Sequence, residues 1–213
     1  MMEMQWISDV AMTGGNRVFR LIGVCGTCFA LSGCLSTQPK GEMSFVAPPM
    51  QWDSHPESAE WTESTMVALS TKDAELSDRI PGDIQTWCPG YAEAPVEDRR
   101  AFWAGLISTV AKYESTWNPA ASGGGGRWIG LMQISPQSAA NYGCEATSAG
   151  ALKDGEANLE CAVEIMSEQV GKDGMVAGGG NQGIGRDWAP LRSDSKRATM
   201  AAWTREQPYC MAG

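Results

Sequence analysis

The segment KYESTWNPAASGGGGRWIGLMQISP, residues 112–136, places an acidic side chain at the inner end of an apolar helical pattern. Apolar residues recur before it at three- and four-residue steps, which predicts one buried helix face in a helix that starts near Val96; they are Phe102, Trp103, Leu106, Ile107, Val110 and Tyr113. Glu114 follows directly. Because a carboxyl group is costly to ionise beside apolar side chains, its pKa is expected to rise. Asn118-Pro119 then ends the helix, since proline cannot continue it.

Several short motifs follow Glu114 in a fixed order: Glu114-Ser115, Asn118-Pro119, Ser122 in a loop, Gly130-Leu131-Met132-Gln133, Pro136 and Tyr142-Gly143. This order resembles the catalytic core of the soluble-type lytic transglycosylases, a branch of the goose-type lysozyme superfamily. The resemblance implies a mostly α, lysozyme-like domain with a glycan cleft. The glycine loop, Gly123 to Gly126, departs from the family pattern by being slightly longer than usual.

The resemblance also implies a reaction. Such enzymes cleave the MurNAc–GlcNAc β-1,4 bond of peptidoglycan without water and form 1,6-anhydroMurNAc. One glutamate, here Glu114, acts first as acid and then as base, and no cofactor is required. Ordinary glycosidases carry a second carboxylate. None lies near Glu114 in the sequence, and Asp187 is the first candidate for one.

Two other functions stay open at this point. A hydrolytic lysozyme would cut the same bond with water. A catalytically silent peptidoglycan-binding module would keep the groove without depending on Glu114. In all three readings the partner is the glycan strand of peptidoglycan, and no protein partner is identified.

Six residues are expected to bind substrate, namely Ser115, Ser122, Trp128, Met132, Gln133 and Tyr142. Trp128 is the first choice for a sugar-stacking aromatic ring, because indole faces pack on pyranose rings. Four of the others have a structural alternative: a helix-end serine for Ser115, core packing for Met132 and Tyr142, and a satisfied buried amide for Gln133. Asn118 is as well suited to cap its turn as to contact ligand.

Residues 12–34 read MTGGNRVFRLIGVCGTCFALSGC, with two arginines before a short apolar run. This pattern is typical of a secretory signal, and the run is short for a membrane span. Its end, Leu31 to Cys34, resembles a bacterial lipobox, which implies lipidation of Cys34 and export to a membrane, more specifically the outer membrane, facing the periplasm. The alternative is an ordinary signal peptide with an incidental cysteine.

The expected organisation has three parts: a leader and signal peptide over 1–33, a lipidated cysteine, tether and possible accessory helix over 34–80, and a lysozyme-like transglycosylase domain over 81–213. Proline-rich residues 35–56 indicate the tether. Further helices are predicted over 57–80, from Ser135-Pro136 to about Gly143, over 155–170 with Gly171 as the stop, and over 195–205.

Four of the seven cysteines would remain in the mature chain: Cys88, Cys144, Cys161 and Cys210. In an exported protein they indicate two disulfides, with three connectivities open. Cys144–Cys161 and Cys88–Cys210 are favoured, the second because it closes the longer loop. A zinc site is poorly supported, since the mature chain has no Cys-x-x-Cys pair and its one histidine is His55. The net charge of −9 argues against a nucleic-acid partner.

Overall fold

The structure is a computed structural model that describes residues 46–211, and within this range it is mostly helical. The predicted signal segment and Cys34 lie outside the described residues. Among the helices that are described, none is both long and apolar enough to cross a membrane.

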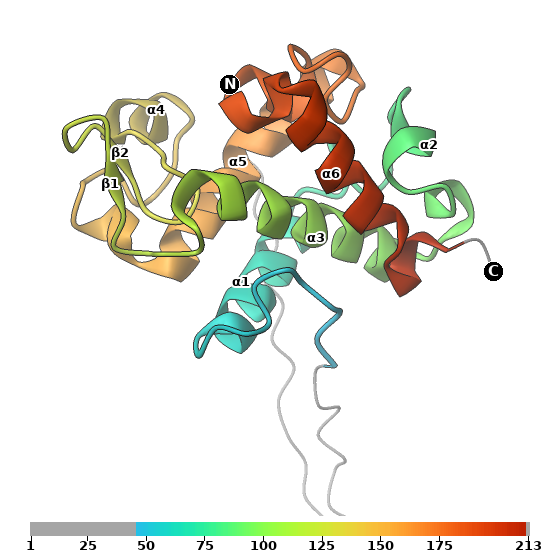
Figure 1. Ribbon diagram of the computed structural model, residues 1–213, viewed down its shortest axis with the longest axis horizontal. Helices are drawn as coiled ribbons and strands as arrows, with labels where there is room; N and C mark the ends of the chain where they lie inside the picture. The colour runs from blue at the N-terminus through green and yellow to red at the C-terminus, as the bar shows by residue number, and fades with distance from the viewer. Residues whose placement is uncertain (1–45, 212–213) are drawn as a thin grey trace, which may run out of the picture. The chain divides into compact units, whose positions relative to one another are not determined.

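Helix α3 (Val96–Ser115) is the element around which the domain is built. It runs across the middle of the domain in Figure 1, where the hairpin and α4 lie beyond one of its ends. The sequence predicts one buried face, yet every residue from Ala101 to Ala111 is buried. The reason is that α1, α6 and short 3-10 helices pack around it from several sides. A helix that is covered on all sides can hold its last turn in a fixed position.

Helix α1 (Ser58–Ser70) packs on α3 and α5. The prediction of one helix over 57–80 is wrong at its C-terminal end. Leu76 is fully buried, and Asp73 forms an ion pair with Arg100 of α3. The ion pair holds the segment after α1 against α3, and the burial of Leu76 fixes the same segment in the core. Trp52, before α1, is also fully buried and belongs to the same hydrophobic core as Trp103 of α3.

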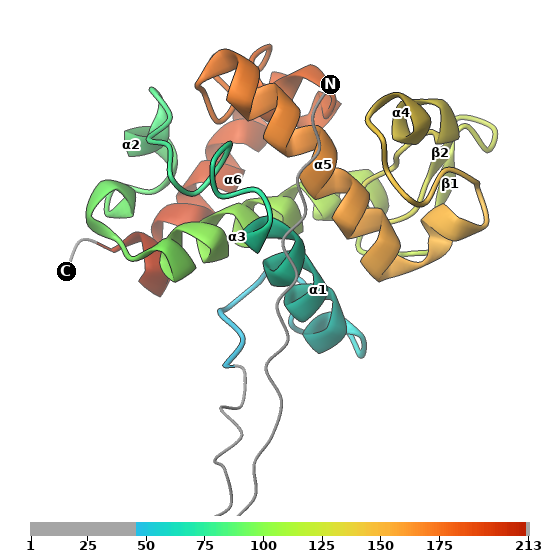
Figure 2. The same cartoon turned by 180° about the vertical axis from the view of Figure 1, so that it is seen from behind.

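The later helices follow the predicted pattern closely. Helix α4 (Pro136–Asn141) begins at Ser135, whose hydroxyl accepts a hydrogen bond from the Ser138 amide at 3.0 Å. Helix α5 (Gly155–Asp173) passes the predicted stop and ends at Gly174, which has φ +62° and donates its amide to the Val170 carbonyl. Helix α6 (Asp194–Arg205) lies on the near face in Figure 1, and α5 on the near face in Figure 2.

Between α3 and α4 the glycine run forms a small antiparallel hairpin. Strand β1 (Ser122–Gly123) pairs with β2 (Trp128–Ile129), in the register Ser122 with Ile129 and Gly123 with Trp128. The remaining elements are short helical turns: α2 (Ile84–Trp87) and 3-10 helices at Tyr91–Glu93, Ala151–Lys153, Gly183–Arg186, Ala189–Arg192 and Pro208–Cys210.

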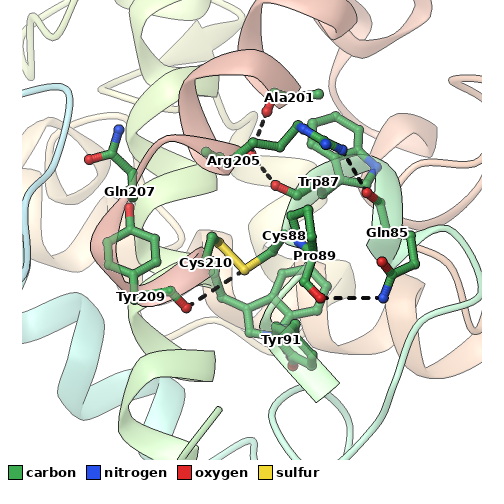
Figure 3. The surroundings of a disulfide bond; sticks show 12 residues. Gln85, Trp87, Cys88, Pro89, Tyr91, Ala201, Arg205, Gln207, Tyr209 and Cys210 are labelled. Carbon is green, nitrogen blue, oxygen red and sulfur yellow. Dashed lines mark hydrogen bonds between the residues drawn. A yellow bond between two sulfur atoms is a disulfide. The ribbon is translucent and has the colours of Figure 1, made fainter. Parts of the chain in front are cut away.

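Two disulfides close the domain, with the pairings that the sequence favours. Cys144–Cys161 joins the loop after α4 to α5, and Cys88–Cys210 joins the segment before α3 to the segment after α6. Figure 3 shows the surroundings of Cys88–Cys210, where Arg205 of α6 donates to the Gln85 carbonyl at 2.7 Å. The Gly90 amide also donates to the Cys210 carbonyl at 3.0 Å. The C-terminal end of α6 is thereby held against the segment around α2.

Candidate active site

Glu114 stands on the last turn of α3 and is half-buried. Burial raises the pKa of its carboxyl to about 7, and the positive charge of Lys196 on α6 opposes that rise. A carboxyl group with a pKa near neutrality is protonated in a large fraction of molecules at neutral pH. It can therefore give up a proton and take one back under the same conditions.

Glu114 faces a cavity of about 310 Å³ that is built from three separate stretches of the chain. The hairpin and the turn after it contribute Trp128 and Gln133, and the segment before α6 contributes the opposite wall; the lining residues there are Asp187, Trp188, Ala189 and Arg192. Ala189 and Arg192 were not among the site residues predicted from the sequence.

A smaller cavity of about 60 Å³ adjoins the first and shares four of its lining residues, Trp128, Gln133, Asp187 and Trp188. It extends the groove toward Ser135 and Ser138 at the start of α4. Trp128 is 44% exposed, which is unusual for tryptophan in this structure, and it stands where the two cavities meet. The arrangement is a groove with an aromatic ring at its centre.

Backbone strain is concentrated beside this groove. Among the non-glycine residues of 46–211, only Thr116, Trp117 and Gln133 have positive φ, at +54°, +57° and +50°. Two of them directly follow the last turn of α3, and the third lines the groove. Left-handed backbone in such residues persists only where the surroundings enforce it, and it tends to occur at functional sites.

A buried asparagine of α5 holds the turn that carries Gln133 by hydrogen bonds. Asn158 is fully buried, accepts the Met132 amide at 2.8 Å, and donates to the carbonyls of Ile129 and Leu152 at 3.1 and 2.9 Å. Asn158 was not among the site residues predicted from the sequence. The signal was present, because Asn158 is a polar residue on the apolar stripe of the predicted helix, four positions before Ala162.

Replacing Asn158 by Ala is expected to lower the free energy of unfolding by about 3 kcal/mol, because it leaves the Met132 amide and the Leu152 carbonyl buried without partners. The Ile129 carbonyl still accepts the Ile134 amide at 2.9 Å. Urea denaturation followed by circular dichroism measures this. Asn181, which is exposed, supplies the matched control as Asn181→Ala, with an expected change within about 0.5 kcal/mol. An equal loss in both variants would contradict the bracing role of Asn158.

The other residues expected to bind substrate are placed as follows. Ser115 donates to the Ala111 carbonyl at 3.3 Å, within its own helix. Ser122 is exposed on β1. Met132 is 1% exposed and belongs to the core, so its side chain packs, while its carbonyl accepts the Trp188 indole at 3.0 Å. None of these three lines the groove. Asn118 caps its turn by accepting the Ala120 amide at 3.0 Å.

Gln133 and Tyr142 have hydrogen-bond partners within the protein. The Gln133 side chain donates to the Gly130 carbonyl at 2.9 Å and also lines the groove. The Tyr142 hydroxyl accepts from Gln169 at 2.5 Å and donates to Asp187 at 3.3 Å. Gln169 also donates directly to Asp187 at 2.8 Å. Tyr142 and Gln169 hold the Asp187 carboxylate at the edge of the groove, so Tyr142 acts on the site through Asp187.

Two positively charged side chains complete the site, Arg192 just before α6 and Lys196 on α6. Arg192 lines the groove, and its guanidinium donates to the Gly185 carbonyl at 3.0 Å and to the Arg186 carbonyl. On α6, the ammonium of Lys196 lies 5.2 Å from the centre of the aromatic ring of Tyr113, the residue that precedes Glu114. In residues 46–211 no three His, Cys, Asp or Glu side chains are grouped so that they could hold a metal ion.

Comparisons with known proteins agree with this fold. The family model described as "Transglycosylase SLT domain" matches residues 94–202, just over half of the chain. Among solved structures, wild-type DslA is 28% identical with a TM-score of 0.69, and 77% of this chain and 98% of that chain are covered. Two Glu-to-Gln mutants of DslA give TM-scores of 0.70 and 0.69 at 28% and 26% identity, each covering 78% of this chain and 98% or 100% of its own.

A search of curated protein sequences finds no match. The family model nevertheless spans α3 with Glu114, the hairpin, α5 and most of α6, which are the elements that build and support the groove. The chain therefore belongs to the transglycosylase SLT domain family, a lysozyme-like family of the lytic transglycosylase type that acts on peptidoglycan.

Proposed function

We propose that this protein is a lytic transglycosylase that cleaves the MurNAc–GlcNAc β-1,4 bond of peptidoglycan and releases 1,6-anhydroMurNAc ends. One observation carries the proposal: Glu114 is half-buried on the groove, and its pKa is raised to about 7. Family membership supports the substrate class.

In the first step Glu114, in its protonated form, donates its proton to the oxygen of the scissile glycosidic bond. The bond between that oxygen and C1 of MurNAc breaks, and the GlcNAc alcohol leaves. Positive charge develops at C1 in an oxocarbenium-like state. The apolar surroundings of the last turn of α3 favour the neutral acid before the step, so the proton is available at neutral pH.

In the second step the Glu114 carboxylate takes the proton of the C6 hydroxyl of the same MurNAc. The C6 oxygen forms a bond to C1, which closes the anhydro ring and restores protonated Glu114. No water is consumed, so a single carboxyl group serves both steps. A pKa close to neutrality suits this double use, because neither direction of proton transfer is strongly uphill.

Hydrolysis is the second candidate, and the position of Asp187 favours it. This carboxylate lines the same cavity as Glu114 and is fixed by Gln169 and Tyr142, so it is suited to activating a water molecule. Mass spectrometry of muropeptides after digestion of purified sacculi separates the two functions. Anhydro ends, lighter than reducing ends by one water, support the transglycosylase, and reducing ends as the main product would exclude it.

The activity should depend on pH in a direction set by Glu114. Since the proposed first step needs the protonated acid, kcat/KM is expected to fall as the pH rises through about 7. Initial rates of muropeptide release between pH 5 and about 9 measure this decrease in kcat/KM. A rate that keeps rising through neutrality would contradict the assignment of Glu114 as the acid.

Stability gives a check on the same group that is independent of catalysis. The pKa of Glu114 is higher in the folded protein than the usual 4.5, so between pH 4.5 and about 7 the folded state binds more protons than the unfolded state. The free energy of unfolding should therefore fall with rising pH across this window. In Glu114→Gln, the free energy of unfolding should lack this part of its dependence on pH. Urea denaturation of both proteins at several pH values measures the difference.

The setting at the membrane is also a proposal. We infer from residues 12–34 that the chain is exported and lipid-anchored at Cys34, more specifically at the outer membrane, facing the periplasm. Labelling cells with a palmitate analogue tests it: the protein should incorporate the label, and Cys34→Ser should not. Labelled Cys34→Ser protein would contradict the anchor.

A further inference from the structure

We infer that Gly123 and Gly124 are positioning residues of the groove, because the absence of their side chains sets where Gln133 and Trp128 stand. The inference rests on the proposed function, since it assigns these glycines a role in binding glycan. It concerns the hairpin between α3 and α4, where two glycines lie against cavity-lining side chains and two others lie in open space.

Gly124 lies against the indole of Trp128. A Cβ at this position would come within 2.1 Å of Cζ3 and 2.2 Å of Cε3 of the ring, so the ring could not keep its place. Trp128 is 44% exposed, and therefore it can move without breaking the core. A side chain at position 124 would displace the ring that stands where the two cavities meet.

Gly123 lies against the amide of Gln133. A Cβ here would come within 2.4 Å of Oε1 of Gln133, the residue that lines both cavities. The Gln133 side chain cannot retreat freely, because its nitrogen donates to the Gly130 carbonyl at 2.9 Å. Gly123 also pairs with Trp128 in the hairpin, so one strand residue borders both cavity-lining side chains.

Gly125 and Gly126 provide the contrast. Both have positive φ, +70° and +89°, as Gly124 does at +55°, but a Cβ at either position would meet no atom within 4 Å. An alanine at position 125 therefore bears the backbone cost of the left-handed conformation without touching Trp128. Gly124→Ala and Gly125→Ala differ mainly in contact with the indole, which makes them a matched pair.

The test measures binding of soluble, uncross-linked glycan strands in the inactive Glu114→Gln protein by isothermal titration calorimetry. Gly124→Ala is expected to raise Kd roughly three- to tenfold, the effect of losing one well-placed aromatic contact, whereas Gly125→Ala should stay within about twofold. In a Trp128→Ala background, Gly124→Ala should have no further effect. Equal effects of the two alanines, or an effect that persists without Trp128, would overturn the inference.

Gly123→Ala is a second, independent variant, because the backbone at 123 is not in the left-handed region. It should weaken binding in the parent and not in a Gln133→Ala background; an undiminished effect there would count against the inference.

The indole NMR signal of Trp128 tests the placement of its ring without any glycan: Gly124→Ala should shift this signal and Gly125→Ala should not. If the parent binds no glycan while this shift is seen, the proposed function fails and the positioning by Gly124 stands.

Discussion

Replacing Glu114 by Gln should lower the rate of glycan cleavage by about a thousandfold, the usual range for loss of a general acid–base group. Gln has nearly the shape of Glu, but it can neither donate the proton to the glycosidic oxygen nor remove one from the C6 hydroxyl. Both proposed steps fail together, so kcat should fall far more than KM rises. Release of muropeptides from purified sacculi, quantified by liquid chromatography, measures the effect.

The control for this change is Glu206→Gln, which makes the same substitution at an exposed position at the end of α6. It should leave turnover within about twofold of wild type, as most surface substitutions do. Binding of glycan strands to Glu114→Gln should persist, because the groove keeps its walls. Unchanged turnover in Glu114→Gln would refute the proposed mechanism, and a wild type without turnover would favour the silent binding module.

Removing the Cys88–Cys210 disulfide, as the double alanine variant, should lower the free energy of unfolding by about 4 to 5 kcal/mol. The two cysteines are 122 residues apart and enclose α3, the hairpin, α4, α5 and α6. The cross-link therefore restricts nearly the whole unfolded domain, and this restriction is the source of its stabilisation in the chain-entropy model. Urea denaturation of the oxidised proteins gives the difference.

The second disulfide supplies the comparison. Cys144 and Cys161 are only 17 residues apart, so the double alanine variant at these positions should lose about 3 kcal/mol. The order of the two losses is the test, because both sites are buried and both changes remove the same atoms. A larger loss for Cys144–Cys161 would show that local packing, and not loop length, governs the contribution of these bonds.

The parts of the site that could be predicted from the sequence are those with local signals. The apolar spacing before Glu114 gives the bounds of α3, and the raised pKa of Glu114 follows from the same spacing. Ser135-Pro136 is a local start signal, and α4 begins there. Asp187 was the first candidate for a second carboxylate, and it lines the cavity with Glu114.

The remaining parts depend on contacts between distant segments, which no local pattern encodes. Helix α1 ends early because Asp73 meets Arg100 of α3, twenty-seven positions later. Arg192 lines the groove because the 3-10 helix Ala189–Arg192 places it there. A helix this short has no hydrophobic periodicity from which its position could be predicted. Gly123 to Gly126 look alike in the sequence, although only two of them approach side chains of the groove.

The span of the Cys88–Cys210 bond has a consequence for biogenesis. Of the four disulfide-bonded cysteines, a chain that emerges amino end first presents Cys88, then Cys144 and Cys161, and Cys210 last. If oxidation simply joined neighbours as they appeared, Cys88 would bond to Cys144, which is a mispaired intermediate. The native pattern is nested, with one bond inside the other, so maturation must either wait for the final cysteine or rely on thiol exchange catalysed by an isomerase.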